Sequence, residues 1–179
     1  MTTVPGILVV TGASGAGKTA TVQALDARAV PGVRCFHFDS IGVPTPDVME
    51  RDFGGAERWQ ASATGEWLAR LSSLSADVHL AVLDGQMRPR FVFDSAARAL
   101  PRGVHVVLLD CSPRVRKERL RGPRRQPELA TAQMDQWATY LRGQADSMDL
   151  PVIDTTTLTV DEAAAQLEEL ARTRCWSRT

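Results

Sequence analysis

Five short, largely apolar runs recur along the chain, and helical stretches separate them. A run of about five or six such residues is typical of a strand that is buried on both faces, as in a parallel sheet. The first four runs are followed closely by a loop glycine or an aspartate, so each has a clear end. The predicted strands are residues 7–11, 33–38, 78–83, 104–109 and 151–153.

Apolar residues recur at helical spacing in most of the stretches between these runs. Residues 42–56 are the exception, and we expect them to be irregular because they contain two prolines and a Gly-Gly pair. Strands that alternate with helices predict an α/β fold, a three-layer sandwich in which a five-stranded parallel sheet has helices on both faces. The predicted helices are 20–29, 57–74, 89–100, one that starts near 113 and carries basic residues through 125, 127–149 and 160–172.

The residues after the first predicted strand match the phosphate-binding loop pattern G-x-x-x-x-G-K-[ST]. Glycine and other small residues let backbone N–H groups wrap around a polyphosphate, and the following helix turns its N-terminus toward the anion. Lys18 is expected to reach the β- and γ-phosphates of ATP, and the Thr19 hydroxyl to bind Mg²⁺. The predicted nucleotide-binding residues here are Gly12, Ala13, Ser14, Gly15, Ala16, Gly17, Lys18, Thr19 and Ala20.

Aspartates follow the next three predicted strands, at the sheet edge where α/β proteins bind ligands. Asp39 is interpreted as the base that takes or orients the proton of an acceptor hydroxyl, with a turn cap shared with Ser40 as the alternative. Asp84 is interpreted as a magnesium residue, although Asp84-Gly85 is also a common turn dipeptide. Asp110 occupies the same kind of position.

Seven cations crowd residues 114–125, opposed there only by Glu118. Phosphoryl transfer needs cations around the transferred group, and arginine contacts phosphate oxygens in pairs. Arg119 and then Arg125 are the predicted phosphate contacts, with the remaining basic side chains on the surface. A solvated helix face is the alternative interpretation of the whole run.

With these motifs the chain resembles the small P-loop kinases, namely the nucleoside-monophosphate kinase group and relatives such as shikimate, gluconate and chloramphenicol kinases. Val82–Arg88 resembles the adenylate kinase segment Leu-Asp-Gly-Phe-Pro-Arg, except that Gln86-Met87 replaces Phe-Pro. His37–Ser40 resembles the end of the second strand in small-molecule kinases, where an aspartate faces the acceptor hydroxyl. The resemblance covers the layout of the whole chain but only short stretches of its sequence.

The resemblance implies three further features. The basic run corresponds to a lid over about residues 116–130, with Gly122-Pro123 as a flexible joint. Residues 42–76 correspond to an acceptor-binding insertion, and residues 154–157, Thr156 among them, lie where relatives place backbone against adenine. A cap for the last helix, with Thr159 as N-cap and Glu162 at N3, explains that final segment equally well. The predicted substrate-binding residues are Asp39, Trp59, Gln86 and Arg88.

Composition adds few constraints. The 179 residues suit one domain, and a formal net charge of zero gives no general attraction to nucleic acid or to an anionic membrane. No apolar run is long enough to cross a membrane, and no signal-like segment opens the chain. Three widely spaced cysteines are expected to be buried free thiols, which fits a cytoplasmic protein.

Together these observations predict an ATP-dependent, Mg²⁺-requiring phosphotransferase that acts on a hydroxyl of a small molecule. A nucleoside or nucleotide kinase is the first alternative. The second is a nucleotide-dependent switch or slow ATPase that acts through a partner, with Gln86 positioning water. The sequence selects neither the acceptor nor the oligomeric state.

Overall fold

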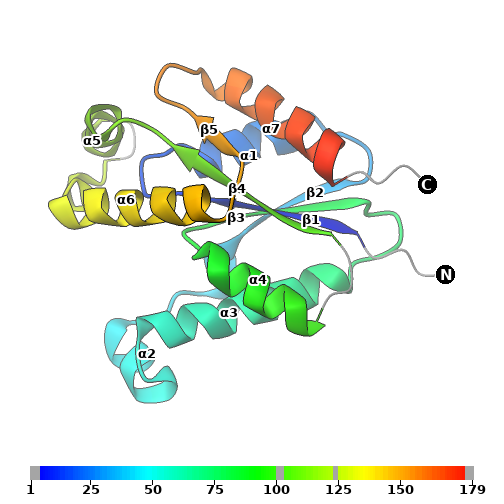
Figure 1. The fold of residues 1–179 in the computed structure, drawn as a ribbon, viewed down its shortest axis with the longest axis horizontal. Helices are drawn as coiled ribbons and strands as arrows, with labels where there is room; N and C mark the ends of the chain where they lie inside the picture. Colours follow the sequence, from blue (N-terminus) through cyan, green and yellow to red (C-terminus); the bar gives the residue numbers. More distant parts are fainter. Residues whose placement is uncertain (1–4, 100–102, 123–124, 176–179) are drawn as a thin grey trace.

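The sheet forms the centre of the molecule. The computed structural model describes residues 5–99, 103–122 and 125–175, and it contains five parallel strands in the order β2-β3-β1-β4-β5 (Figure 1). The central strand pairs on both sides, so that Val9 lies opposite Leu83 on one neighbour and Val106 on the other. The strands are β1 (Gly6–Thr11), β2 (Val33–His37), β3 (Leu80–Asp84), β4 (Val104–Asp110) and β5 (Val152–Asp154).

Helices cover both faces of this sheet (Figure 1). Two of them, α1 and α7, pack against each other on one face, whereas α3 and α4 cover the other and α6 packs beside β4. The predicted three-layer α/β fold is therefore confirmed. The helices are α1 (Lys18–Ala27), α2 (Pro46–Phe53), α3 (Ala56–Ser72), α4 (Pro89–Ala99), α5 (Pro113–Arg121), α6 (Ala132–Ser147) and α7 (Val160–Arg174).

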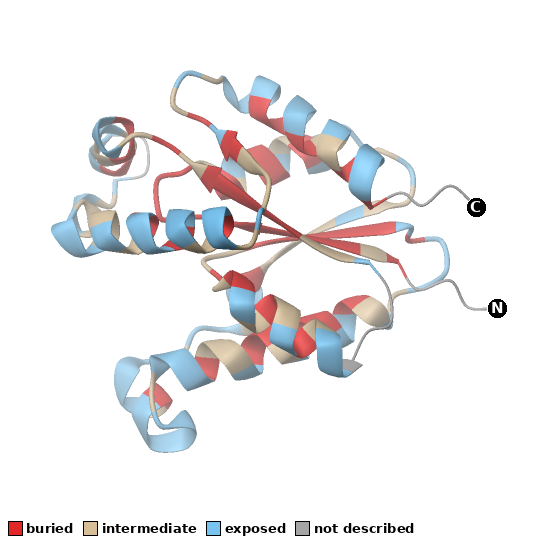
Figure 2. Cartoon of the chain, viewed as in Figure 1, coloured by how far each residue is buried: buried red, intermediate tan, exposed pale blue. Residues whose placement is uncertain are grey.

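Alternate residues of the central strand fill the two halves of the core. Ile7 and Val9 join the cluster under α3 and α4, and Leu8 and Val10 join the cluster under α1 and α7. All four side chains are fully buried, and burial of one such side chain stabilises the fold by roughly 1.5–3 kcal/mol. The sheet is accordingly the most buried layer, while the outer helix faces are exposed (Figure 2).

The expectation that residues 42–56 are irregular was wrong, because they contain α2. The Thr45 hydroxyl accepts a hydrogen bond from Val48 N, and Pro46 occupies the first helical position, where its missing N–H costs nothing. Gly54 then ends the helix with a left-handed φ of 73°. The proline taken as a helix breaker is therefore part of a helix start.

Two other boundaries also differ from the prediction. The basic helix α5 ends at Arg121, not at 125, and Gly122 follows it as its C-cap. Residues 127–129 form the 3₁₀ helix η2 (Pro127–Leu129), and α6 begins later because the Thr131 hydroxyl caps it by accepting from Met134 N. Residues 123–124, which include half of the predicted joint, lie outside the described residues, as does residue 100 of the helix predicted over 89–100.

The carboxyl ends of the strands lie on the side of the molecule where α5 is found (Figure 1). In parallel α/β sheets ligands bind outside these ends, at the point where the strand order reverses. Here β1 is connected through α1 to β2, and β3 lies between the two strands. Among the described helices, none combines the length and hydrophobicity that a membrane span requires.

Candidate active site

The loop between β1 and α1 is shaped by three glycines. Gly12, Gly15 and Gly17 have φ values of 156°, 85° and 94°, which side-chain-bearing residues rarely adopt. A Cβ atom at Gly12 would lie 2.3 Å from the Leu109 carbonyl oxygen. No side chain caps the N-terminus of α1, so its first amides remain available to an anion. The loop therefore fits a polyphosphate through its backbone.

Lys18 lies within this loop. Its side chain is only 5% exposed, and Nζ donates a hydrogen bond to the Ala13 carbonyl oxygen at 3.0 Å. Burial and this hydrogen bond hold the ammonium group within the loop. Thr19, the next residue, faces two cavities, one on each side of the loop.

One of these two cavities has a volume of about 260 Å³ and is lined by side chains from the ends of different strands. We call it the central cavity. It lies next to Lys18 and receives side chains from the ends of β2 and β3 as well as from the loop. Its lining residues include Ser14, Lys18, Thr19, His37, Asp39, Asp84 and Gln86. Six predicted site residues, namely Ser14, Lys18, Thr19, Asp39, Asp84 and Gln86, are thereby brought together.

Asp84 is 3% exposed and is paired with a histidine that sequence reasoning passed over. His37 and Asp84 are direct neighbours at the ends of β2 and β3, and His37 Nδ1 lies 2.5 Å from Asp84 Oδ1. This contact orients the carboxylate and leaves Oδ2 for another partner. The pairing depends on β2 and β3 being adjacent, which the sequence does not state.

Asp39 lies in the 3₁₀ helix η1 (Phe38–Ile41), directly after β2, and its side chain is exposed to the central cavity. Its neighbour Phe38 is buried and anchors this turn, because the Trp67 indole donates to the Phe38 carbonyl oxygen at 2.9 Å. Trp59, expected in the acceptor pocket, is instead part of the core and meets Phe38 edge to face at 5.9 Å. Trp59 therefore packs against the residue that precedes Asp39.

A larger cleft, of about 740 Å³, adjoins the central cavity and shares Gln86 with it. The Gln86 amide donates to Ser14 Oγ at 2.6 Å, and Gln60 of α3 donates to the Gln86 carbonyl oxygen at 2.7 Å. Gln60 also accepts from Arg88 at 2.7 Å, so Arg88 lines this cleft but is already partnered. Gln60, absent from the predicted set, lines the larger cleft and holds Gln86, the residue that the two cavities share.

On the other side of the phosphate loop, a cavity of about 380 Å³ lies between α1 and α7. Arg119 of α5 reaches it and donates to Thr155 Oγ1 at 2.9 Å and to the Thr155 carbonyl oxygen at 2.7 Å. Thr155 in turn donates to the Ala16 carbonyl oxygen at 2.8 Å. Thr156, the residue predicted to contact nucleotide, accepts from Ser112 N at 2.9 Å, and Thr155 lines the cavity instead.

The predicted cap of α7 is confirmed beside this cavity. The Thr159 hydroxyl accepts from Glu162 N, and the Glu162 carboxylate accepts from Thr159 N at 2.8 Å. The hydrogen bonds that the Glu162 carboxylate accepts from the Thr159 N–H and from the Thr159 hydroxyl lower the pKa of Glu162. The start of α7 is therefore fixed where it forms one wall of the cavity.

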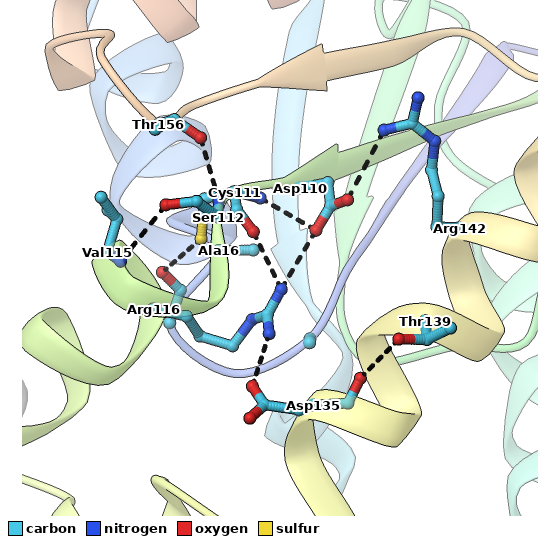
Figure 3. A network of polar contacts seen from close by, with 12 residues as sticks. Ala16, Asp110, Cys111, Ser112, Val115, Arg116, Asp135, Thr139, Arg142 and Thr156 are labelled. Carbon is cyan, nitrogen blue, oxygen red and sulfur yellow. Dashed lines mark hydrogen bonds and ion pairs between the residues drawn. The ribbon is translucent and has the colours of Figure 1, made fainter. Parts of the chain in front are cut away.

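Arg116 was predicted to lie on the surface, and this was wrong. Its side chain is 4% exposed and lies between two carboxylates, 3.3 Å from Asp110 Oδ1 and 2.9 Å from Asp135 Oδ1 (Figure 3). It also donates to the Cys111 carbonyl oxygen at 2.9 Å. Gly15 permits this approach, since a Cβ atom there would lie 2.9 Å from Arg116 Cγ. The basic helix is thus tied to the phosphate loop.

The other end of the basic run is exposed. Arg125 has a φ of 49°, and its backbone N–H donates to the Gly122 carbonyl oxygen at 3.1 Å. Its side chain is on the surface, so a contact with phosphate remains a prediction. Arg119, the other predicted phosphate contact, lines a cavity beside the phosphate loop.

All three cysteines are free, and Cys111 and Cys175 are buried as predicted, whereas Cys35 is only partly buried, so the prediction of a buried thiol was wrong there. Burial raises the pKa of the Cys35 and Cys175 thiols to about 12 and also raises the pKa of Cys111. All three therefore remain protonated near neutral pH, which makes them poor nucleophiles.

Comparison with known proteins rests on structure alone. A scan against protein-family models gives no match, and a search of curated proteins finds no relative. Among solved structures, shikimate kinase from Acinetobacter baumannii has a TM-score of 0.63 at 20% identity, over 98% of this chain and 97% of that one. A tunicamycin resistance protein from Deinococcus radiodurans has a TM-score of 0.65 at 20% identity, over 93% and 95%.

A nucleotide kinase is also similar. Thymidylate kinase from Candida albicans has a TM-score of 0.63 at 12% identity, and the match covers 95% of this chain and 92% of that one. Shikimate kinase and thymidylate kinase thus share one architecture with this chain, at sequence identities of 20% and 12%. The predicted resemblance is confirmed at the level of structure: the chain has the fold of the small P-loop kinases.

Proposed function

We propose that this protein is an ATP-dependent phosphotransferase that moves the γ-phosphoryl group of ATP to a hydroxyl of a small molecule. The observation that carries the proposal is the central cavity, which Asp39, Asp84 and the buried Lys18 line together. The cavity lies between the nucleotide side of the phosphate loop and the larger cleft. A donor and an acceptor can therefore meet there.

The chemistry follows from these positions. The acceptor oxygen attacks the γ-phosphorus, the bond from that phosphorus to the β–γ bridging oxygen breaks, and ADP leaves. Asp39 takes the hydroxyl proton, while Lys18, Arg119 and Arg125 neutralise charge on the phosphates. No covalent enzyme intermediate is needed, because catalysis in this class is positioning plus electrostatics.

Magnesium fits this site. Thr19 and Asp84 line the same cavity and offer a hydroxyl and a carboxylate oxygen, the hard donors that Mg²⁺ prefers. They would hold the ion, which when bound neutralises phosphate charge. His37 keeps the Asp84 carboxylate turned toward the cavity.

ATP fits for a similar reason. The glycine φ values and the uncapped start of α1 leave the loop amides free for phosphates, and the cavity beside Arg119 and Thr155 has room for the rest of the nucleotide. We assign residues 12–20 and Arg119 to the nucleotide, with Thr155 in place of Thr156. The lid assignment for residues 116–130 rests on Arg119 reaching this cavity from α5.

A screen should identify the acceptor first. We expect ATP consumption to rise sharply with a suitable hydroxylated compound, and mass spectrometry should find that compound phosphorylated. If no hydroxylated compound in a broad library raises ATP consumption above the basal rate, the kinase proposal fails and a slow ATPase becomes the better description.

Replacing Asp39 with asparagine should lower kcat by about 10²-fold or more with that acceptor. The substitution keeps the size of the side chain but removes the base, so affinity for an ATP analogue should change little. Asp94→Asn is the matched control, since Asp94 is an exposed residue of α4. An unchanged kcat in Asp39→Asn would reduce Asp39 to a turn residue.

Arg119→Ala should lower kcat by about 10²-fold while weakening ATP binding far less, because the charge that Arg119 meets grows during transfer. Arg121→Ala, on an exposed position of the same helix, is the control and should retain full kcat. Equal effects of the two substitutions on kcat would argue against a specific role for Arg119. Steady-state kinetics with an independent measurement of nucleotide affinity separates the two parameters.

A further inference from the structure

The 740 Å³ cleft next to the central cavity is large for an acceptor site. Its volume lies within the range of about 300–1,000 Å³ that holds drug-sized ligands. It is bounded by α3, by the turn after β3, by η2 and by α6, and Gln86 connects it to the central cavity. A small metabolic acid would leave much of this space unfilled.

The charges in the cleft cancel one another. Arg90 and Arg88 both pair with Glu57, Arg88 at 3.7 Å. Arg88 also donates to Gln60 and lies over the Trp137 ring at 4.9 Å. The charged lining residues are Glu57, Arg88, Arg90 and Glu128, which is two of each sign.

A cleft with balanced charges favours an uncharged acceptor over an anionic one. An anionic group would compete with Glu57 for both guanidinium groups and would meet Glu57 and Glu128 as like charges. The sequence-based expectation that Arg88 grips a substrate anion therefore has weak support. An uncharged acceptor suffers neither of these penalties.

The α6 side of the cleft offers an aromatic surface. The rings of Trp137 and Tyr140 stack with centroids 5.3 Å apart and planes 17° from parallel. Tyr140 is 37% exposed, and Met134 and Leu129 extend the apolar surface beside it. A flat ring of a ligand can stack on such a surface.

Polar groups surround this aromatic surface. Within the described residues, no hydrogen bond occupies the Gln133 amide, the Gln136 amide or the Tyr140 hydroxyl. Each of these groups both donates and accepts, which is the pattern that matches hydroxyl groups. The cleft thus combines a stacking platform with neutral hydrogen-bonding groups.

We propose that the acceptor is an uncharged, ring-bearing polyhydroxy compound of roughly nucleoside or aryl-glycoside size, and not a carboxylate or a phosphate ester. The inference rests on the proposed kinase function and deepens it. The ring lies against Tyr140, the hydroxyls meet Gln133 and Gln136, and one hydroxyl extends past Gln86 toward Asp39.

Matched pairs of compounds test whether the acceptor is uncharged. Uridine is compared with uridine 5′-monophosphate, and phenyl β-glucoside with phenyl β-glucuronide, by thermal shift with a non-hydrolysable ATP analogue and by ATP consumption. We expect the neutral member of at least one pair to bind at least about tenfold more tightly than its anionic partner. The uridine and glucoside arms distinguish a nucleoside from a glycoside. Binding of anionic members only, or of no member, overturns the proposal.

Three substitutions test the aromatic surface at Tyr140 and the charge pairing at Glu57. Tyr140→Ala should weaken binding of the preferred compound about tenfold, whereas Tyr140→Phe keeps the ring and should largely retain affinity. Glu57→Gln releases Arg88 and Arg90 and should shift the neutral-to-anionic affinity ratio about tenfold toward the anion. An unshifted ratio, or equal losses in both Tyr140 variants, contradicts the assignment. If the broad library yields only an anionic acceptor, the kinase function stands and this inference alone fails.

Discussion

Replacing Lys18 with alanine should lower kcat by at least about 10²–10³-fold and leave the protein folded. A drop of this size is expected because the substitution removes one preorganised cationic donor from a buried site. Lys18 is 5% exposed, and its ammonium group is held by the Ala13 carbonyl oxygen within the loop, so it meets phosphate without first being reorganised. Circular dichroism and thermal unfolding should show a native fold, because Lys18 packs against the loop and not within either main core cluster.

Lys18→Arg separates charge from shape. Arginine keeps the positive charge but presents a planar fork in place of the compact ammonium group that donates to the Ala13 carbonyl oxygen, so its donors point in different directions. We expect this variant to remain severely impaired. Near-normal ATP-dependent turnover by Lys18→Ala would show that the loop does not bind the transferred phosphates.

Local signals account for what the sequence predicted well. The central strands are buried on both faces, so Ile7–Val10 and Leu80–Leu83 are apolar without interruption and can be recognised one at a time. The phosphate loop is equally local, since its glycines are required by its own backbone angles. Because parallel strands end at one edge, the positions of Asp39 and Asp84 followed directly from the strand ends.

Contacts between distant segments account for what was missed. His37 and Asp84 meet only because β2 lies beside β3, and Gln60 reaches Gln86 from a different layer. Thr155 and Thr156 are adjacent in one loop, and their side chains differ in direction: Thr155 lines the cavity, whereas Thr156 accepts from Ser112 N. In none of these cases does the residue's own neighbourhood in the sequence reveal its partner.

The basic run shows the same limit. Apart from Arg119 and Arg125, its basic side chains were predicted to lie on the surface, yet Arg116 points inward because α6 supplies Asp135 and β4 supplies Asp110 (Figure 3). Lys117, the next residue, remains 38% exposed and pairs with the same Asp135 at 2.8 Å. Hydrogen bonds from Lys117 and Arg116 hold the pKa of Asp135 below its ordinary value.

Arg116→Met should therefore destabilise the protein by about 3 kcal/mol, near the low end of the cost of removing one partner from a buried ion pair. The low end applies because Lys117 still faces Asp135, and Arg142 lies 3.6 Å from Asp110. For a chain of this length the loss corresponds to a decrease in Tm of roughly 6–12 °C.

Lys117→Met is the matched control, since it removes a cation from the same carboxylate by the same substitution at an adjacent position. An exposed ion pair is worth about 0–1 kcal/mol, so its Tm should change by at most a few degrees. Chemical denaturation of both variants measures the difference in the free energy of unfolding. The buried cation holds α5 against the phosphate loop through Gly15, whereas the exposed one lies outside that contact. If both substitutions lower the free energy of unfolding equally, Arg116 does not hold α5 in place, and Arg119 must be positioned by its own contacts with Thr155 and the Gly15 carbonyl oxygen.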